Sequence, residues 1–349
     1  MKCSHVLILE GGRSVEYEVS LRSSLGIQYA LRSSGFSVGV IRIERDGSWS
    51  DVGGDWPSAN RKFVLSADPH MYTSVSDNLV VFPVLHGPYG EDGTIQGLLE
   101  LANIPYVGCG VLASALGMHK GCQKELFVNH GLQVSPWISV KKSKWESNQE
   151  EMIEKVTLFL KQQYPFFVKP IRTGSSVGIS KVSDKKTLKI AIELSLQYDD
   201  EVIIEQGVNP LREIEVAVLG TTAPEASVIG EIIPDGEFYD YESKYGPESK
   251  TKLSIDPSDI SKKIKNEIRS QAVRAFTILG GSGLSRVDFF LSGNRIIINE
   301  INTLPGFTTI SMYPKLWEAS GISFSDLCTR LVTFGKEAWQ SKQLIKTTV

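Results

Sequence analysis

The spacing of hydrophobic residues divides the first third of the chain into alternating strands and helices. Val6–Leu9 and Leu79–Leu85 are apolar runs, a pattern typical of strands that are covered on both faces. Residues 21–34 and 95–102 repeat apolar positions with the period of a helix, and Phe36–Ile43 is rich in β-branched residues. This order predicts an α/β fold with a parallel sheet, whose functional loops follow the carboxyl ends of the strands.

The rest of the chain has shorter strands and longer connections. We expect the polar residues 44–78 to form irregular excursions or a short peripheral element. The other predicted elements are a helix over Val111–His130, a helix opened by the capping box Ser147–Glu150, strands Phe166–Lys169 and Gly178–Val182, a helix over Asp184–Tyr198, strands Glu201–Glu205, Glu213–Leu219 and Ala226–Ile232, a glycine- and tyrosine-rich loop Pro234–Lys252, an amphipathic helix from Ile260 to Gly280, and a hairpin of Leu284–Leu291 with Arg295–Ile301.

Composition narrows the class of protein. The chain has 349 residues, of which 41% are hydrophobic and 22% charged, so it is long and apolar enough to fold into two or three domains. The net charge of −3 favours neither nucleic acid nor an anionic membrane as a partner. No apolar run reaches the ~18 residues of a membrane helix, and the first one is too short for a signal peptide. We therefore expect a cytoplasmic protein. The scattered cysteines, without metal-ligand spacing, should be buried thiols: Cys3, Cys109, Cys122 and Cys328.

The C-terminal hairpin predicts a metal site from β geometry alone. If it turns on residues 292–294, Arg286 lies opposite Glu300, with Asp288 diagonal to that pair and Asn302 on the same face. Carboxylate and amide oxygens suit Mg²⁺ that holds phosphate, and an arginine suits the phosphoryl group itself. A surface ladder of ion pairs is the alternative. The opposite face carries a core pattern: Val287, Phe289, Leu291, Ile297 and Ile301.

Three further segments carry candidate chemistry. In residues 169–180 a lysine ends a strand and a Gly/Ser loop follows, which suits phosphate oxygens, although plain hairpin turns look similar and no Walker motif is present. The loop after the first strand lacks GxGxxG, so it does not favour a dinucleotide, but its Glu16 could hold an ammonium group. His86 ends a strand where ligands bind in such sheets. The alternatives are a solvated Glu16 and a structural His86.

Taken together, the motifs resemble the D-alanine–D-alanine ligases of the ATP-grasp superfamily over nearly the whole chain. The matching segments, in order, are Gly11–Ser20, His86–Gly87 with Gly90–Thr94, Lys169–Pro170 with Gly174–Gly178, Arg212–Val216, Tyr239–Tyr245 and Asn299–Phe307. The resemblance implies an ATP-grasp fold behind an N-terminal Rossmann-like parallel-sheet domain. The implied domains are 1–118 (substrate), 119–209 (central ATP-grasp) and 210–349 (C-terminal ATP-grasp, with the metal site and a lid over Pro234–Lys252).

The resemblance also implies a role for each site residue. Residues implied in ATP binding are Lys120 and Lys169 at the phosphates, Ser175, Ser176 and Lys244 beside the nucleotide, Glu205 with the backbone of Gln206 and Val208 at adenine, and Glu213 at ribose. Two Mg²⁺ ions, with Mn²⁺ as an alternative, would be held by Asp288, Glu300 and Asn302. Residues implied around the amino acids are Glu16, Ser175 and Tyr245 at the first ammonium, Arg286 and the Gly306 backbone at oxyanion charge, Ser311 at the second carboxylate, and His86 and Met312 in the substrate pocket.

The implied reaction is the ATP-dependent ligation of two D-alanines through a D-alanyl phosphate, for peptidoglycan precursor and cell-wall synthesis. Its partners would be ATP and D-alanine, with neither nucleic acid nor membrane, and the family also allows a homodimer. One alternative is a ligase that joins D-alanine to D-lactate or D-serine. The other is a nucleotide-binding protein that keeps the fold without catalysis.

Overall fold

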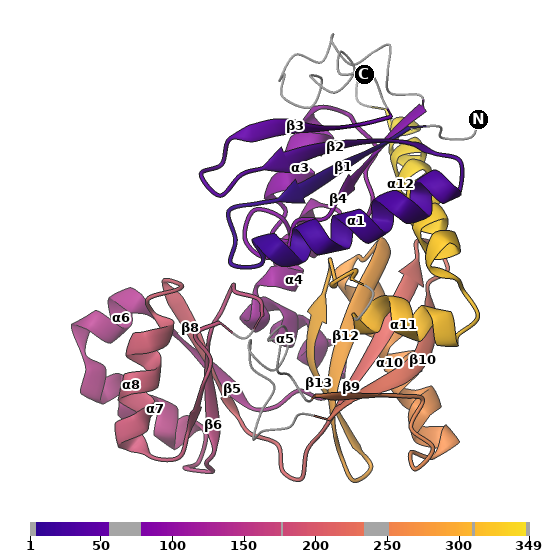
Figure 1. The fold of residues 1–349 in the computed structure, drawn as a ribbon. Helices are drawn as coiled ribbons and strands as arrows, with labels where there is room; N and C mark the ends of the chain where they lie inside the picture. The colour runs from indigo at the N-terminus through magenta and orange to yellow at the C-terminus, as the bar shows by residue number, and fades with distance from the viewer. Residues whose placement is uncertain (1–4, 56–77, 176, 234–250, 309–310, 347–349) are drawn as a thin grey trace.

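The residues that the structure describes form three β-sheets, and helices pack against each of them (Figure 1). The computed structural model describes residues 5–55, 78–175, 177–233, 251–308 and 311–346. The N-terminal sheet lies at the top of Figure 1, the central sheet at the lower left and the C-terminal sheet at the lower right. The α/β class predicted from the sequence is confirmed. The predicted domain boundaries, after residues 118 and 209, stay a prediction.

The N-terminal sheet is parallel except at one edge, as the alternation of strands and helices predicts. Strand β1 pairs in parallel with β2 and β4, while β3, the short element within the polar stretch, pairs antiparallel with β2. The elements of this part are β1 (His5–Gly11), α1 (Tyr17–Ser33), β2 (Ser37–Ile43), β3 (Trp49–Gly54), β4 (Leu79–Pro83) and α3 (Thr94–Leu101).

Helix α1 begins at Tyr17, four residues before the predicted position, and its first turn buries Ser20 as well as Tyr17 and Val19. Ser20 is fully buried, accepts a hydrogen bond from the backbone N–H of Gly11 at 2.7 Å and donates one to the carbonyl of Val84. These bonds join the start of α1 to the carboxyl ends of β1 and β4 and satisfy buried polar atoms.

The central sheet is antiparallel in the order β5-β8-β6-β7. Its three helices cover one face through a core that includes Val202 and Ile204 of β8, so Glu205, which alternates with them, faces the other way. Helix α7 is capped by Asn148, whose side chain accepts from the N–H of Glu151 at 3.1 Å, and not by the predicted Ser147. The elements are β5 (Trp137–Lys141), α6 (Lys142–Ser147), α7 (Gln149–Phe159), β6 (Phe166–Pro170), β7 (Ser180–Val182), α8 (Lys185–Ser195) and β8 (Glu201–Gln206).

The C-terminal sheet is antiparallel in the order β11-β10-β9-β12-β13. Helix α10 covers one face together with α4 and α5, although these two precede the central sheet in sequence. The single helix predicted over Val111–His130 is wrong: the backbone is extended at His119, whose ring accepts from the N–H of Cys122 and starts a second helix. The elements are α4 (Val111–Met118), α5 (Lys120–Asn129), β9 (Arg212–Gly220), β10 (Glu225–Ile233), β11 (Lys252–Ile255), α10 (Lys262–Leu279), β12 (Gly283–Ser292) and β13 (Arg295–Asn302).

The register of the β12–β13 hairpin differs from the prediction. Ser292 pairs with Arg295, so the turn has two residues instead of three, and the ladder skips Asn299, which forms a bulge. Arg286 therefore lies opposite Asn302 rather than Glu300, and Asp288 lies directly opposite Glu300. Because of the bulge, Ile298 pairs with Phe289 and takes the position on the core face that the sequence predicts for Ile297.

The last helix returns to the N-terminal sheet and joins the two ends of the chain. Helices α11 (Met312–Ala319) and α12 (Phe324–Gln343), drawn in yellow in Figure 1, share one core with β1, β2, β4 and α1. The indole N–H of Trp339 in α12 donates to the carbonyl of Asn103 at 3.0 Å. The C-terminal segment is therefore part of the N-terminal core.

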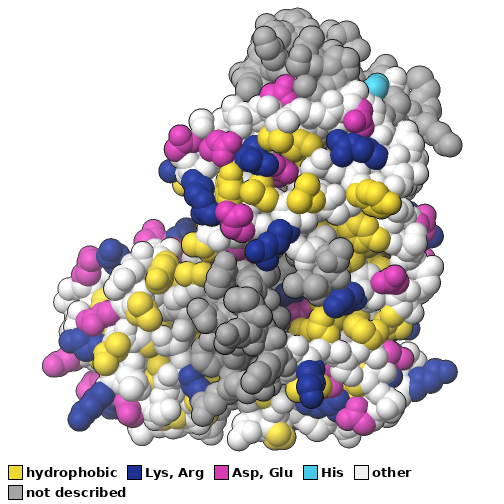
Figure 2. All heavy atoms as spheres, viewed as in Figure 1, with side chains coloured by type: hydrophobic (Ala, Val, Ile, Leu, Met, Phe, Trp, Pro, Cys, Tyr) yellow, Lys and Arg dark blue, Asp and Glu magenta, His cyan; other side chains and the backbone are white. Residues whose placement is uncertain are grey.

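The described cysteines are free thiols, and charged side chains of both signs are mixed on the surface seen in Figure 2. Cys109 and Cys328 are buried thiols and Cys122 is partly buried, all three free, while Cys3 lies outside the described residues. On the face in Figure 2, basic and acidic side chains are interspersed rather than gathered by sign. Among the helices that the structure describes, none is long and apolar enough to cross a membrane.

We expect Leu331→Ala to lower the free energy of unfolding by about 2–5 kcal/mol, because Leu331 of α12 is fully buried in the core shared with the N-terminal sheet. The matched control is Leu344→Ala just after the helix, where the leucine is 86% exposed and the change should cost less than about 0.5 kcal/mol. Urea denaturation measures both. Equal stabilities of the two variants would contradict a core that includes α12.

Candidate active site

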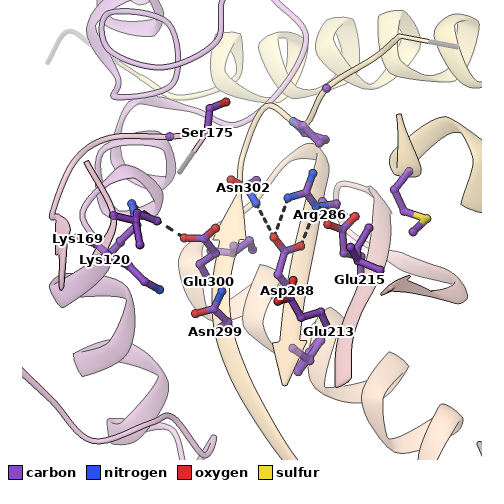
Figure 3. A pocket seen from close by; sticks show the side chains of 18 of the residues that line it. Lys120, Lys169, Ser175, Glu213, Glu215, Arg286, Asp288, Asn299, Glu300 and Asn302 are labelled. Atoms are coloured by element: carbon purple, nitrogen blue, oxygen red, sulfur yellow. Dashed lines mark hydrogen bonds and ion pairs between the residues drawn. The ribbon is translucent and has the colours of Figure 1, made fainter. Parts of the chain in front are cut away.

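A single pocket brings together the predicted site residues that the structure describes (Figure 3). Its walls are the β9-β12-β13 face of the C-terminal sheet and the β6–β8 face of the central sheet, with loops of the N-terminal sheet at one end. The predicted residues that line it are Glu16, His86, Lys120, Lys169, Ser175, Glu205, Gln206, Val208, Glu213, Arg286, Asp288, Glu300, Asn302, Gly306, Ser311 and Met312. Ser176, Lys244, Tyr245 and most of the predicted lid lie outside the described residues.

A row of carboxylates crosses three neighbouring strands on the floor of the pocket. Glu215 of β9, Asp288 of β12 and Glu300 of β13 are register partners. Arg286, two residues before Asp288, contacts both Asp288 oxygens at 2.7 Å and lies 3.2 Å from Glu215. Burial disfavours a charged Arg286, but these carboxylates outweigh it, so the pKa of the guanidinium lies well above its ordinary value.

The donor set at this row fits a hard divalent cation. Asp288 and Glu300 face the pocket side by side, and the Asn302 amide lies 3.0 Å from Asp288. The amide now directs its nitrogen at Asp288, and a half-turn would direct its oxygen there, as a bound cation would favour. Within the described ranges, no three Asp, Glu, His or Cys side chains form a metal cluster, so the candidate ligands are two carboxylates and one amide. Oxygen ligands of this kind suit Mg²⁺.

Lysines from two elements face this row across the pocket. Lys120, at the start of α5, lies 4.0 Å from Glu300 and donates to the carbonyl of Thr173 at 2.6 Å. Lys169, at the end of β6, donates to Glu205 at 2.8 Å. Burial alone would raise the pKa of Glu205, but Lys124 and Lys169 outweigh it and lower that pKa to about 2. This wall therefore presents fixed positive charge to the pocket.

The end of the pocket near the N-terminal sheet is acidic and narrow. Ser175, with a left-handed backbone (φ +48°), donates its hydroxyl to Glu16. A Cβ at position 174 would lie 2.9 Å from a Glu16 oxygen, so glycine lets the loop approach Glu16 without displacing that side chain. Burial, with Glu16 nearby, raises the pKa of Glu91 to about 8, although its carboxylate accepts from the N–H of Gly87.

His86 lines the pocket, and the backbone engages one of its two ring nitrogens. Its Nδ1 lies 3.1 Å from the carbonyl of Leu304, while Nε2 is buried and has no hydrogen-bond partner among the described residues. Burial lowers the pKa of His86, so the neutral ring donates from Nδ1 and keeps Nε2 as an acceptor. A ligand group that donates a hydrogen bond would satisfy this nitrogen.

The opposite corner of this end is built by the turn that enters α11. Ser311 is at the N-cap position of α11 but makes no capping hydrogen bond with its side chain, and its hydroxyl instead accepts from the N–H of Thr308 at 3.0 Å. Gly306 and Met312 line the same corner. A helix N-terminus with nearby hydroxyl groups can receive a carboxylate.

Sequence reasoning missed several residues of the site. Glu215 follows Glu213 by two positions in a strand, and Lys124 follows Lys120 by four in a helix, so periodicity could have placed each on the same face as its predicted neighbour. Glu91 lies within a recognised motif, but only burial reveals its charge environment. The Gln206 side chain donates to Gln163 at 2.6 Å, outside the adenine contact that its backbone could make.

Comparison with known proteins identifies the family of both the N-terminal and the C-terminal part of the chain. The family model described as the D-ala D-ala ligase N-terminus matches residues 5–109, and the model of the D-ala D-ala ligase C-terminus matches residues 126–333. The D-alanine–D-alanine ligase of Heliobacterium modesticaldum is 47% identical over 97% of this chain and 96% of its own length. That of Macrococcus caseolyticus is 44% identical over 99% of both chains.

Solved structures agree with these relatives. The D-alanine-D-alanine ligase from Coxiella burnetii superposes with a TM-score of 0.80 at 33% identity, covering 97% of this chain and 96% of that one. The VanG D-Ala:D-Ser ligase from Enterococcus faecalis also gives 0.80, at 35% identity, covering 95% of this chain and 99% of that one. The chain therefore belongs to the D-alanine–D-alanine ligase family.

Proposed function

We propose that this enzyme joins two D-alanine molecules into D-alanyl-D-alanine, converts ATP into ADP and phosphate, and so supplies a peptidoglycan precursor in the cytoplasm. The observation that carries the proposal is the row of Asp288 and Glu300 beside Arg286, which faces the buried lysines Lys120 and Lys169 across one pocket. Oxygen ligands for a cation opposite paired lysines suit a polyphosphate between them. A homodimer stays a prediction, to be checked by analytical ultracentrifugation.

The nucleotide would lie between the central and C-terminal sheets. Lys120 and Lys169 would contact its phosphates, and Glu205 would accept from the adenine amino group, helped by the backbone of Gln206 and Val208. Glu213, on β9 at the same face, would accept from the ribose hydroxyls. Ser175 would lie beside the phosphates, and Ser176 and Lys244 keep their implied nucleotide contacts as predictions.

Two Mg²⁺ ions, or Mn²⁺, held by Asp288, Glu300 and Asn302 would supply charge compensation at the phosphoryl group. Arg286 is fixed by Asp288 and Glu215, so its guanidinium needs no reorganisation to stabilise the oxygens of the transferring group. The chain thus contributes a preorganised positive edge beside the cation ligands.

Glu16 would hold the ammonium group of the first D-alanine. The hydroxyl of Ser175 would keep the Glu16 carboxylate in place for this contact. The carboxylate of that D-alanine attacks the γ-phosphorus of ATP, so an O–P bond forms and the bond to ADP breaks. The amine of the second D-alanine, having lost a proton, then attacks the acyl carbon and expels phosphate. Arg286 and the Gly306 backbone would stabilise the oxyanion.

Ser311 would bind the carboxylate of the second D-alanine, and His86 would accept a hydrogen bond from one of the substrates through Nε2. Tyr245 stays a predicted partner of Ser175. Met312 offers no strong hydrogen-bond partner to the hydroxyl of D-serine, which favours alanine at this corner.

We expect Glu300→Gln to lower kcat by about 10²-fold or more while the fold persists, because the change removes one carboxylate where phosphoryl charge develops. Steady-state kinetics with D-alanine at ordinary Mg²⁺ measures the loss, and circular dichroism checks the fold. Glu318→Gln, an exposed change on α11, is the control and should leave kcat unchanged. Near-normal turnover of Glu300→Gln would remove the basis for the cation assignment.

The raised pKa of Glu91 predicts how stability depends on pH. The folded protein holds this proton up to about pH 8, whereas the unfolded chain releases it near the ordinary value of 4.5. The folded state thus binds more protons between these values, and stability falls as pH rises through this window. We expect the substrate-free wild type to lose several degrees of Tm more than Glu91→Gln between pH 5 and 9. Parallel Tm curves would contradict this assignment.

We expect D-alanine to be the preferred second substrate. With ATP, Mg²⁺, D-alanine and an about tenfold excess of D-lactate or D-serine, we expect D-alanyl-D-alanine to predominate near neutral pH. D-lactate is disfavoured because an amine is a far better nucleophile than a hydroxyl and residues 234–252 contain no histidine to act as an added base. D-serine also attacks through an amine, and it is disfavoured because Met312 offers its hydroxyl no strong hydrogen-bond partner. Mass spectrometry of the products separates the cases. If D-alanyl-D-lactate or D-alanyl-D-serine predominates, the second substrate must be reassigned. Absence of D-alanine-dependent ATP hydrolysis would favour a non-catalytic nucleotide-binding protein.

A further inference from the structure

Lys124 is a fully buried cation behind the pocket wall, outside the mechanism described above. It lies one turn after Lys120 on α5 and is 1% exposed. Lysine is almost never buried to this extent unless it is paired, because the charged group loses its hydration. The pocket is lined by Lys120 but not by Lys124, so a role of Lys124 in the reaction must pass through its neighbours.

The ammonium group of Lys124 contacts both walls of the pocket. Its Nζ lies 3.0 Å from Glu205 Oε1 on β8, in the central sheet, and donates to the carbonyl of Asn299 at 3.1 Å on β13, in the C-terminal sheet. Asn299 is the bulge residue that the β12–β13 ladder skips. A bulge leaves its residue unpaired in the ladder, which makes this carbonyl available to the lysine.

The neighbouring residue fixes the helix from which Lys124 extends. Gln123 accepts from the N–H of Ile301 at 2.9 Å and donates to the Ile301 carbonyl at 3.3 Å, so α5 is fastened to β13 independently of Lys124. The base of the lysine is thus fixed to one wall. Its tip sets the position of Glu205 on the other wall.

Lys124 also changes the charge that the pocket receives. Glu205 bonds Lys169 through Oε2 at 2.8 Å and meets Lys124 through Oε1, so two lysines share one carboxylate. The cluster keeps one excess positive charge. Of the two lysines that share Glu205, Lys169 lines the pocket and Lys124 does not. Without Lys124, Glu205 would therefore neutralise the positive charge that Lys169 presents to the pocket.

We propose that Lys124 is a positioning residue of the nucleotide site, which holds the Glu205 carboxylate across the gap between the two sheets and leaves the charge of Lys169 to the phosphates. The inference rests on the proposed ATP site. It assigns Lys124 no contact with ATP and no part in binding the amino acids.

The test is Lys124→Met, which keeps most of the length of the side chain and removes the charge. We expect the Kd for ATP with Mg²⁺, measured by titration calorimetry, and the KM for ATP to rise about tenfold or more, while the KM for D-alanine stays within about twofold. A purely structural role would not separate the two substrates. An ATP affinity equal to that of the folded wild type would overturn the inference, whereas a wild type that binds no ATP would overturn the proposed function instead.

The matched control is Arg42→Met, which breaks another buried ion pair, with Glu10 at 2.6 Å in the N-terminal sheet. Arg42 itself is partly exposed, but its removal leaves the buried Glu10 with one cation fewer, as Lys124→Met does at Glu205, and both KM values should stay within about twofold of the wild type. A tenfold rise in the KM for ATP in this variant would overturn the inference, because the effect would then follow from lost stability alone.

A double-mutant cycle tests whether Lys124 acts through Glu205. We expect Lys124→Met with Glu205→Gln to bind ATP as Glu205→Gln does, within about twofold, because no carboxylate then remains to be held. The double variant contains no Glu205 carboxylate and keeps the positive charge of Lys169, so it is the variant to measure if Lys124→Met alone does not fold. A further tenfold loss in the double variant would overturn the inference.

Discussion

The register of β12 between β9 and β13 decides which side chains face the pocket. In an antiparallel pair, a slip of one residue turns every side chain of the strand to the opposite face. The observed register places Glu215, Asp288 and Glu300 in one row, and the bulge at Asn299 keeps Glu300 beside Asp288 while Ile298 stays in the core. The proposed cation ligands and the core of the C-terminal sheet thus depend on the same pairing.

Alternating charges then organise the two walls. On the floor, Arg286 lies between Glu215 and Asp288, and on the opposite wall Glu205 lies between Lys124 and Lys169. Buried ions are stable only when they are paired, so each set holds its members in a fixed geometry. A site of this kind enters the reaction with its dipoles and charges already oriented, which is the main source of electrostatic catalysis.

Segments that are far apart in the sequence pack together around these walls. Helices α4 and α5 precede the central sheet but pack against the C-terminal one, and α12 returns to the core of the N-terminal sheet. The loop that carries Glu16 therefore meets Ser175 of the central part at the pocket, although the two residues are 159 positions apart in the sequence. The proposed binding site for the first ammonium group, at Glu16, is thereby connected to the loop that follows β6.

The sequence by itself determined the order of the elements and the residue types of the site. Apolar runs and periodicities are local signals, and they predicted the parallel N-terminal sheet, the hairpin and the segments that contribute to the pocket. The motifs were sufficient to indicate the family, which the comparisons confirm. Even the pocket-facing side of Asp288 and Glu300 follows from alternation along each strand.

Only the tertiary structure decided the pairing and the burial. The two-residue turn and the bulge set the register, and no local pattern distinguishes them from a three-residue turn. The break at His119 interrupts an apolar sequence that continues as a helix on both sides. Lys124 and Glu91 look like ordinary surface residues in the sequence. Their depth, and therefore their charge environment, depends on sheets that are far away along the chain.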